Sequence, residues 1–338
     1  MSIKSSKERR GDSDMNEQRL LVSPAPHFRR NRDSQSIMLD VIIALIPAFM
    51  ASVLIFGWRS LLVVSVCVIT CVLSEFLFQK LCKRTVTVND FSAVVTGMLL
   101  GFNLPYTVPI WQAVFGSLVA IVVVKQLFGG IGKNFANPAI TARIVMTVSF
   151  ASAMTDFSIL GAPDTISSAT PLASNAGPLY TVFLGQYAGE SQNKLLTLFL
   201  GNHAGSLGET CALAILIGGI YLLCRRIISW HIPVAFIGTA AVLGAIAGHN
   251  ALEYILCGGL LLGAFFMATD YSTSPSTKWG KIIFGIGCGL ITFVIREFGG
   301  YPEGVSFSIL LMNIVSPYIS MITRKRPFGT KKKGGKKV

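Results

Sequence analysis

The sequence predicts an all-α polytopic membrane protein of about ten transmembrane helices, arranged as two inverted five-helix repeats with broken helices. The first observation is composition: of 338 residues, 52% are hydrophobic and 13% are charged, whereas soluble proteins carry about 25% charged residues. The second is that the net charge of +13 gathers at the chain ends. Basic tails around an apolar body are typical of the positive-inside rule. The composition excludes a soluble enzyme, and no nucleic-acid-binding motif accompanies the charge.

Ten apolar segments approach the length of about 20 residues that a membrane helix needs. The third segment is short and ends at Asn103, and the eighth is short and ends at Asp270. These two are the expected broken helices. The ten segments cover residues 38–57, 60–80, 91–104, 108–128, 136–155, 208–228, 232–249, 252–268, 279–297 and 304–323.

The positions of the basic residues predict the orientation of these segments. With both termini in the cytoplasm, 25 of the 29 Lys and Arg fall on the cytoplasmic side and three fall outside, as the positive-inside rule requires. The chain then consists of basic cytoplasmic tails (1–36 and 324–338), two transmembrane repeats (37–155 and 208–323) and an outward loop (156–207). A loop of that length seldom serves only as a connection.

A pattern of glycine and proline recurs between the two halves of the chain. Gly97 precedes Phe128 and a Gly-Gly pair in the first half, as Gly263 precedes Phe298 and a Gly-Gly pair in the second. Each repeat has five spans, which is an odd number, so the second repeat must enter the membrane from the opposite side. Inverted repeats of this kind are found in transporters, where substrates bind near broken helices at the membrane midplane.

Ionisable residues inside membrane segments are functional candidates because burying a charge in lipid is costly. We assign an ion pathway to Asp270 and Asn103, at the ends of the two broken helices. The alternative for an acid such as Asp270 is a place at the headgroup boundary, where it costs little. The sequence contains no Ser/His/Asp set, no zinc-ligand spacing and no haem attachment motif, so we predict neither a catalytic residue nor a metal site.

The outward loop contains the run Asp164-Thr165-Ile166-Ser167-Ser168-Ala169-Thr170. Taken alone, it is a Ser/Thr-rich loop that ends in a turn. It also resembles the signature at which a flavin transferase esterifies FMN phosphate to a threonine, in the family of the RnfD and NqrB proteins. Ser168 stands where glycine is commoner. Further motifs of that family follow in order, at Ser23–His27, Asn89–Ala93, Gly129–Ala139, Phe266–Asp270 with Ser274-Pro275, and Tyr301–Gly304 with Leu311–Asn313.

The resemblance implies a cofactor and its site. It places covalent FMN on Thr170 through a phosphoester, within a recognition sequence formed by Asp164, Ser167, Ser168 and Ala169. The sister family allows a second, non-covalent flavin such as riboflavin, and the sequence leaves its presence open. The Rnf complexes of this family move electrons between ferredoxin and NAD and couple this to Na⁺ or H⁺ transport across the bacterial cytoplasmic membrane, so the resemblance implies the same role here. The expected partners are the Rnf subunits A, B, C, E and G, the flavin transferase and the lipid membrane.

Two other functions remain open from the sequence. The chain could be the NqrB component of the Na⁺-translocating NADH:quinone reductase, although that sister protein tends to have a longer region before its first span. It could also be a transporter or channel that uses the inverted repeat without a cofactor. A fluorescent flavin band on a denaturing gel separates this last function from the two redox functions.

Overall fold

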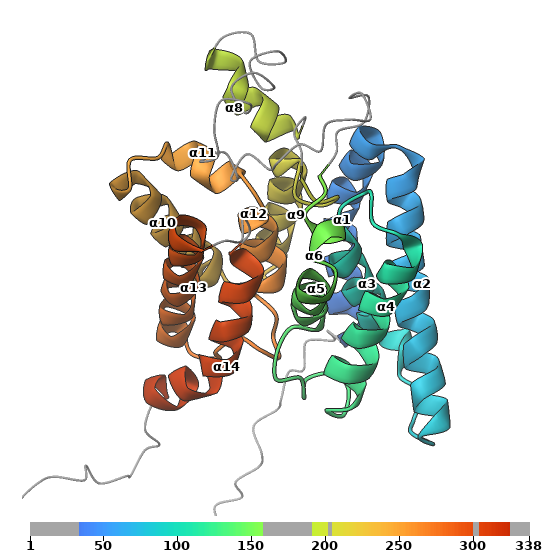
Figure 1. Cartoon of the computed structure of the whole chain (residues 1–338). Helices are drawn as coiled ribbons and strands as arrows, with labels where there is room; N and C mark the ends of the chain where they lie inside the picture. The colour runs from blue at the N-terminus through green and yellow to red at the C-terminus, as the bar shows by residue number, and fades with distance from the viewer. Residues whose placement is uncertain (1–33, 158–190, 202–204, 300–303, 325–338) are drawn as a thin grey trace, which may run out of the picture. The chain divides into compact units, whose positions relative to one another are not determined.

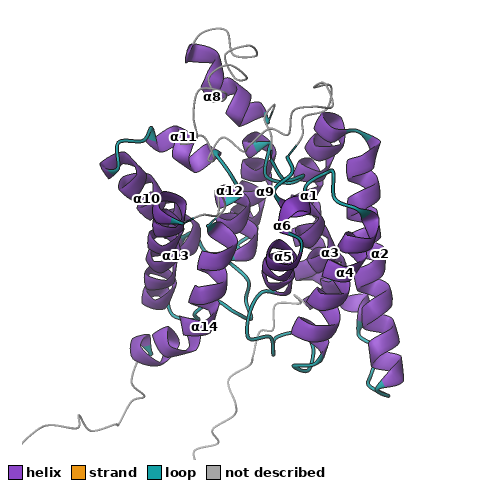
Figure 2. Cartoon of the chain, in the orientation of Figure 1, coloured by secondary structure: helices purple, strands orange, loops and turns teal. Residues whose placement is uncertain are grey.

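The computed structural model describes residues 34–157, 191–201, 205–299 and 304–324. The chain divides into Met1–Arg32 and Asp33–Val338, and the described helices all belong to the second unit. Every regular element in the four described ranges is helical (Figures 1 and 2). The all-α fold class is therefore confirmed.

The first repeat begins with two long helices that are joined through a single glycine. Gly57 has φ 70°, a left-handed conformation that favours glycine, and it lets the chain reverse between them. The next helix is short and ends at Asn103. The elements are α1 (Ser34–Phe56), α2 (Trp58–Leu81), η1 (Val88–Asp90), α3 (Ser92–Phe102), α4 (Ile110–Leu118), its π-helical continuation η2 (Val119–Gln126), α5 (Pro138–Ser149) and α6 (Ala151–Met154).

The second repeat follows the same order. Its third member is again interrupted, and its last two helices are long. After α8 (Ser191–Leu200), the elements are α9 (Ala212–Cys224), α10 (His231–Ile246), α11 (Ala251–Leu256), α12 (Leu260–Leu262), its π-helical continuation η4 (Gly263–Met267), α13 (Lys278–Phe298) and α14 (Val305–Thr323). Within the described ranges, four helices are long and apolar enough to cross a membrane by themselves, namely α1, α2, α13 and α14.

The third and eighth predicted spans are broken helices in the structure. Helix α3 has 11 residues, which at 1.5 Å per residue cover about 17 Å, roughly half of the hydrocarbon core. The eighth span divides into α11 and the joined pair α12 and η4, with Cys257–Gly259 between them. Each repeat therefore contains a helix that ends inside the bundle, as predicted.

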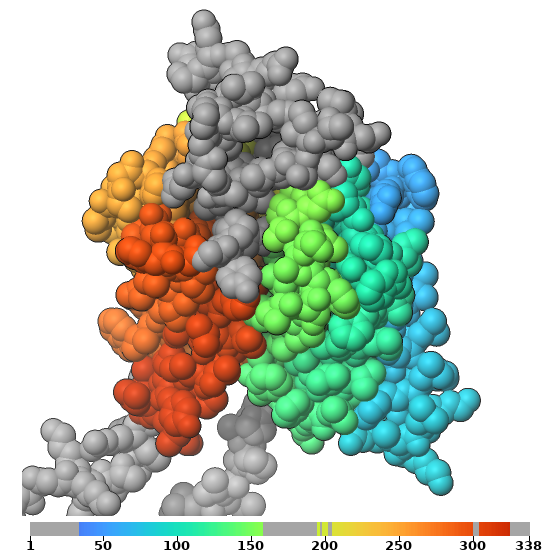
Figure 3. Space-filling model, in the orientation of Figure 1, coloured from blue at the N-terminus to red at the C-terminus, as the bar shows by residue number. Residues whose placement is uncertain are grey.

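The two repeats meet through equivalent helices. The first helices, α1 and α9, pack together, and so do the last helices, α5 and α14. Figure 3 shows the second contact as the boundary between the green and red surfaces. Gly218 of α9 lies against the backbone oxygen of Ala44 in α1, so closely that a Cβ atom would overlap it. Small residues at helix crossings are a common feature of membrane proteins. Pairing of equivalent helices is what a two-fold relation between the repeats produces.

Hydrogen bonds tie the helix ends together at two opposite ends of the bundle. At the first end, Arg225 after α9 lies 3.0 Å from the carboxylate of Asp40 in α1, and Arg84 after α2 donates to the carbonyl of Gln126 at 2.9 Å. At the second end, His249 after α10 lies 2.9 Å from Glu297 in α13. The loops that carry most of the basic residues all lie at the first end. Successive helices therefore run in alternate directions between the two ends.

We expect the first end to face the cytoplasm, and native Cys82 offers a test because it is exposed just after α2. Ala247, exposed at the second end, supplies the matched position as Ala247→Cys. In this variant, a membrane-impermeant maleimide should label position 247 in intact cells and Cys82 only after the membrane is broken, as read by peptide mass spectrometry. Labelling of Cys82 in intact cells would reverse the predicted orientation.

Candidate functional site

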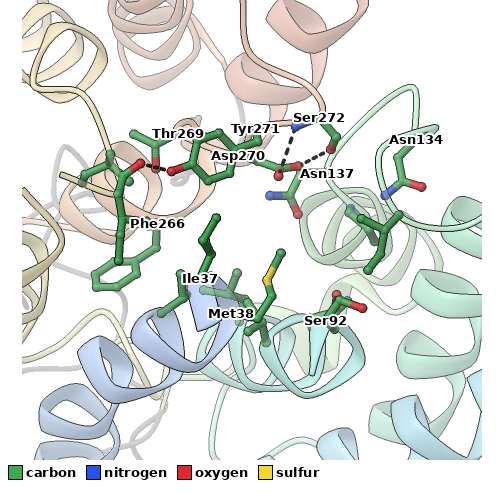
Figure 4. Close-up of a pocket in the computed structure, with 18 of the residues that line it drawn as sticks. Ile37, Met38, Ser92, Asn134, Asn137, Phe266, Thr269, Asp270, Tyr271 and Ser272 are labelled. Atoms are coloured by element: carbon green, nitrogen blue, oxygen red, sulfur yellow. Dashed lines mark hydrogen bonds between the residues drawn. The ribbon is translucent and has the colours of Figure 1, made fainter. Parts of the chain in front are cut away.

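A cavity of about 340 Å³ lies between the two repeats, near the first end of the bundle. Its volume is within the range of small-molecule sites in proteins. The wall combines apolar side chains with several polar ones (Figure 4). The lining residues are Ile37, Met38, Val41, Ser92, Val95, Thr96, Leu99, Lys125, Ile131, Gly132, Asn134, Asn137, Pro138, Leu222, Ile227, Ile228, Phe265, Phe266, Thr269, Asp270, Tyr271 and Ser272.

Asp270 lies on the wall of this cavity, three residues after η4. Its carboxylate accepts hydrogen bonds from the Ser272 hydroxyl at 2.8 Å and the Thr273 hydroxyl at 3.3 Å. Asn137 lies near it in the same view (Figure 4) and donates to the carbonyl of Met267 at 3.3 Å. The structure therefore brings the predicted ion-pathway acid to the end of a broken helix, among hydroxyl and amide groups. Broken-helix ends with such oxygen donors bind Na⁺ or H⁺ in transporters.

Asn137 is also the residue that begins α5. Its side-chain oxygen accepts from the backbone N–H of Ala139 at 3.0 Å, which is a helix cap, and Pro138 occupies the first helical position, where it is favoured. The preceding turn uses Gly129, Gly130 and Gly132, all with positive φ. The Gly-Gly-Ile-Gly motif at residues 129–132 therefore forms a turn that places the start of α5 at the cavity.

Asn103, the other predicted ion-pathway residue, lies at the end of α3. Its amide nitrogen donates to the carbonyl of Leu99 at 2.6 Å and lies 3.7 Å from the sulfur of Met267. Its amide oxygen accepts a hydrogen bond from Arg143 of α5. The structure therefore brings the ends of the two broken helices together, as the repeat suggested. The Asn103 oxygen, however, is engaged by a guanidinium.

Lys125 and Glu75 form a buried ion pair at the first end. The Lys125 ammonium lies 2.7 Å from Glu75 Oε2, and the two side chains are 2% and 1% exposed. Lys125 also donates to the Ser92 hydroxyl at 2.7 Å, and Gln126 donates to Glu75 at 2.9 Å. Both side chains are therefore interior, although the count of basic residues for the positive-inside rule places Lys125 in a cytoplasmic loop and the hydropathy pattern alone makes Glu75 an acid near the end of a span. Lys125 belongs to η2, and π-helical turns occur frequently at functional sites.

The sequence holds a signal for this pair. Lys125 directly follows the run Val122-Val123-Val124, an unusual place for a loop lysine. Glu75 lies within the second apolar segment rather than after it. Arg143 is recognisable as a residue inside a span, but its acid partner Glu209 is missed, because Glu209 opens the sixth apolar segment and looks like a boundary residue.

We expect Lys125→Met to disrupt the protein because it leaves the Glu75 carboxylate buried and unpaired. Breaking a buried pair typically costs about 3–5 kcal/mol, so the variant should be recovered from membranes in much lower amount. Adding Glu75→Gln should restore recovery, because no charge is then unpaired. Lys133→Met is the control, since Lys133 is exposed. Equal recovery of Lys125→Met and Lys133→Met would show that the pair adds no stability.

The flavin-site prediction falls outside the described residues. Asp164, Ser167, Ser168, Ala169 and Thr170 all belong to residues 158–190, so the attachment of FMN to Thr170 stays a prediction. Arg296, near the end of α13, donates to the carbonyls of Tyr254 and Cys257 at 2.9 and 3.0 Å.

Comparison with known proteins gives one consistent result. The model of the NQR2, RnfD, RnfE family matches residues 21–329. The chain is 48% identical to the D subunit of the Na⁺-translocating ferredoxin:NAD⁺ oxidoreductase complex of Acetobacterium woodii, over 94% of this chain and 98% of the relative. It is 38% identical to the D subunit of the proton-translocating ferredoxin:NAD⁺ oxidoreductase complex of Clostridium ljungdahlii, over 92% of this chain and 96% of the relative. It is 37% identical to the D subunit of the ion-translocating oxidoreductase complex of Alcanivorax borkumensis, over 92% and 97% respectively.

These matches cover the described helices, both broken helices and the outward loop. They confirm the resemblance that the motifs suggested. The chain belongs to the NQR2, RnfD, RnfE family.

Proposed function

We propose that this chain is RnfD, the membrane redox component of an Rnf-type complex that couples electron transfer between ferredoxin and NAD to Na⁺ or H⁺ translocation. The observation that carries the proposal is its 48% identity, over 94% of the chain, to a relative named as that component. Relatives named as Na⁺-translocating and as proton-translocating both match along almost their whole length. The ion therefore stays open between Na⁺ and H⁺.

The redox role rests on covalent FMN at Thr170. In the ester, the flavin phosphate is joined to the ribityl chain on one side and to Thr170 Oγ1 on the other. A flavin transferase that uses FAD would balance this reaction, because the threonine hydroxyl displaces AMP from the flavin phosphorus. A covalent bond retains the flavin and fixes its distance from its redox partners. The protein orients such a cofactor and tunes its electronics.

The ion role rests on Asp270 at the wall of the cavity. A carboxylate attracts a cation to the end of η4, and the neighbouring hydroxyl and amide groups can replace part of its hydration shell. The cavity indents the bundle from the end that we assign to the cytoplasm. We call the route from this cavity past Asp270 to the second end the ion path.

The same cavity fits the ring of a second, non-covalent flavin such as riboflavin. Phe266 and Tyr271 supply aromatic surface, and the side-chain oxygen of Asn134 is buried with no hydrogen-bond partner among the described residues. Asn134 would accept from a ring N–H, and the aromatic side chains would pack on the ring. A bound flavin supplies one- or two-electron chemistry, while these residues hold and orient it.

The proposal includes the bacterial cytoplasmic membrane with both termini inside, the Rnf subunits A, B, C, E and G as partners, and a flavin transferase for maturation. The test is ferredoxin-dependent NAD⁺ reduction in membrane vesicles that contain the complete complex, measured together with cation uptake. NADH-dependent quinone reduction in its place would support the sister reductase. A purified chain without a fluorescent band on a denaturing gel would support a transporter that lacks the covalent cofactor.

A further inference from the structure

Residues 205–210 return from the second end of the bundle to the broken end of α3. The backbone N–H of Leu207 donates to the carbonyl of Leu104 at 3.0 Å, and that of Gly208 donates to the carbonyl of Phe102 at 2.8 Å. A helix end inside a membrane needs such partners, because lipid offers none for its free carbonyls. Ser206 and Glu209 of this segment are 0% and 3% exposed. The segment therefore closes the bundle beyond Asn103.

Arg143 of α5 joins this segment to the end of α3. Its guanidinium donates to Asn103 Oδ1 and, at 2.7 Å, to Glu209 Oε1; the Ser206 hydroxyl lies 3.4 Å away. One oxygen from the end of α3 and two from the 205–210 segment thus converge on one cationic group. Side-chain oxygens of this kind are also what a partly dehydrated cation requires.

The second carboxylate oxygen of Glu209 takes no part in the contact with Arg143. Glu209 Oε2 is buried and has no hydrogen-bond partner among the described residues, although an unmet buried acceptor is costly. The carboxylate also lies against Gly259, where a Cβ atom would overlap it, at the break that precedes α12. Glu209 is therefore situated between the two broken helices and has one oxygen without a protein partner in the described ranges.

Comparison of the two repeats indicates that the fold does not require a charged residue at the position of Arg143. With the spacing of 170 residues that separates Phe128 from Phe298, Arg143 of α5 corresponds to Asn313 of α14. Asn313 is 2% exposed, and neither of its amide atoms has a partner within the described ranges. One repeat thus has a guanidinium where the other has a neutral amide.

We propose that Arg143 and Glu209 form the outer gate of the ion path, an inference that rests on the proposed ion role of this chain. While the guanidinium holds Asn103 Oδ1 and Glu209 Oε1, a cation that has reached Asp270 meets a fixed positive charge, and these two oxygens are not available to bind it. Positive side chains exclude cations from membrane pores in this way. Because arginine does not lose its proton in proteins, the gate opens through movement of the 205–210 segment.

The test uses the complete complex reconstituted in liposomes, without ferredoxin or NAD. The variant is the double substitution Arg143→Gln with Glu209→Gln, which removes both members of the ion pair together. We expect release of trapped radioactive sodium, or decay of an imposed pH gradient, to be at least about tenfold faster, which corresponds to about 1.4 kcal/mol of barrier. Glu297→Gln is the matched control, because it removes one negative charge at the second end that is paired with His249 and not with Arg143.

A structural role for the pair makes a different prediction. If Arg143 and Glu209 only stabilise the fold, liposomes with the assembled double variant will release Na⁺ and H⁺ no faster than those with the wild type. That result would overturn the gate. If the double variant does not assemble, Glu209→Asp is the test, because it keeps both charges but moves the carboxylate away from Arg143. Ion release from liposomes with Glu209→Asp at the wild-type rate would contradict the gate.

Adding Asp270→Asn to the leaking double variant separates the gate from the ion role. A slower leak supports both proposals. An unchanged leak means that the ions do not pass Asp270, which contradicts the proposed ion path while the gate stands.

Discussion

Replacing Thr170 by alanine is expected to abolish the flavin fluorescence of the protein on a denaturing gel. A phosphoester needs a hydroxyl, and the resemblance selects Thr170 among several hydroxyls in the outward loop. One residue of that loop contributes little to a bundle of helices, so the protein should remain in the membrane at normal amount. In-gel fluorescence and the mass of the peptide that contains residue 170 measure the effect.

Nearby hydroxyls supply the controls for this result. Ser167→Ala and Ser168→Ala should keep most of the fluorescence, and Thr170→Ser should keep part of it, because serine retains the hydroxyl without the methyl group. Persistent fluorescence in Thr170→Ala would contradict the assignment. So would an unmodified Thr170 peptide from wild-type protein that was produced together with its flavin transferase.

Asp270→Asn is expected to reduce cation transport severely while it leaves covalent flavin content unchanged. The substitution keeps the size of the side chain and its polar contacts to Ser272 and Thr273, but removes the negative charge that attracts the cation. Transport in vesicles and in-gel fluorescence of the same preparation measure the two effects separately.

Asp90→Asn is the matched control for this variant. Asp90 belongs to η1, is partly exposed and does not line the cavity, so its loss should leave transport near the wild-type rate. Equal transport by Asp270→Asn and the wild type would assign Asp270 to a headgroup boundary and refute its role on the ion path.

Local signals in the sequence are sufficient to predict the helices. Apolar segment length predicts where helices form, and the breaks at Asn103 and Asp270 are visible because glycine, proline and polar residues interrupt the apolar runs. The repeat, although short in sequence, is matched by the packing of α1 on α9 and of α5 on α14.

Pairing between distant residues is not predictable in the same way. Glu75 and Lys125 are 50 residues apart, and Arg143 and Glu209 are 66 apart. Apart from Arg143, which lies inside a predicted span, each residue alone looks like a boundary or a loop residue, because charge at the edge of an apolar segment is the ordinary case. Only helix packing reveals that these charges neutralise one another inside the bundle. Asn103 shows the same limit, since its position is predicted but its guanidinium partner is not.

The shortness of α3 has an electrical consequence. Because α3 ends about halfway through the hydrocarbon core and the cavity indents the bundle from the first end, the insulating part of the protein is thinner than the bilayer around it. A membrane voltage then falls mainly between the floor of the cavity and the second end. One elementary charge crossing the full voltage gains or loses about 2.3 kcal/mol per 100 mV, so a displacement of a few ångströms near Asn103 would be coupled to a larger share of the membrane potential than the same displacement in a protein that insulates the whole bilayer.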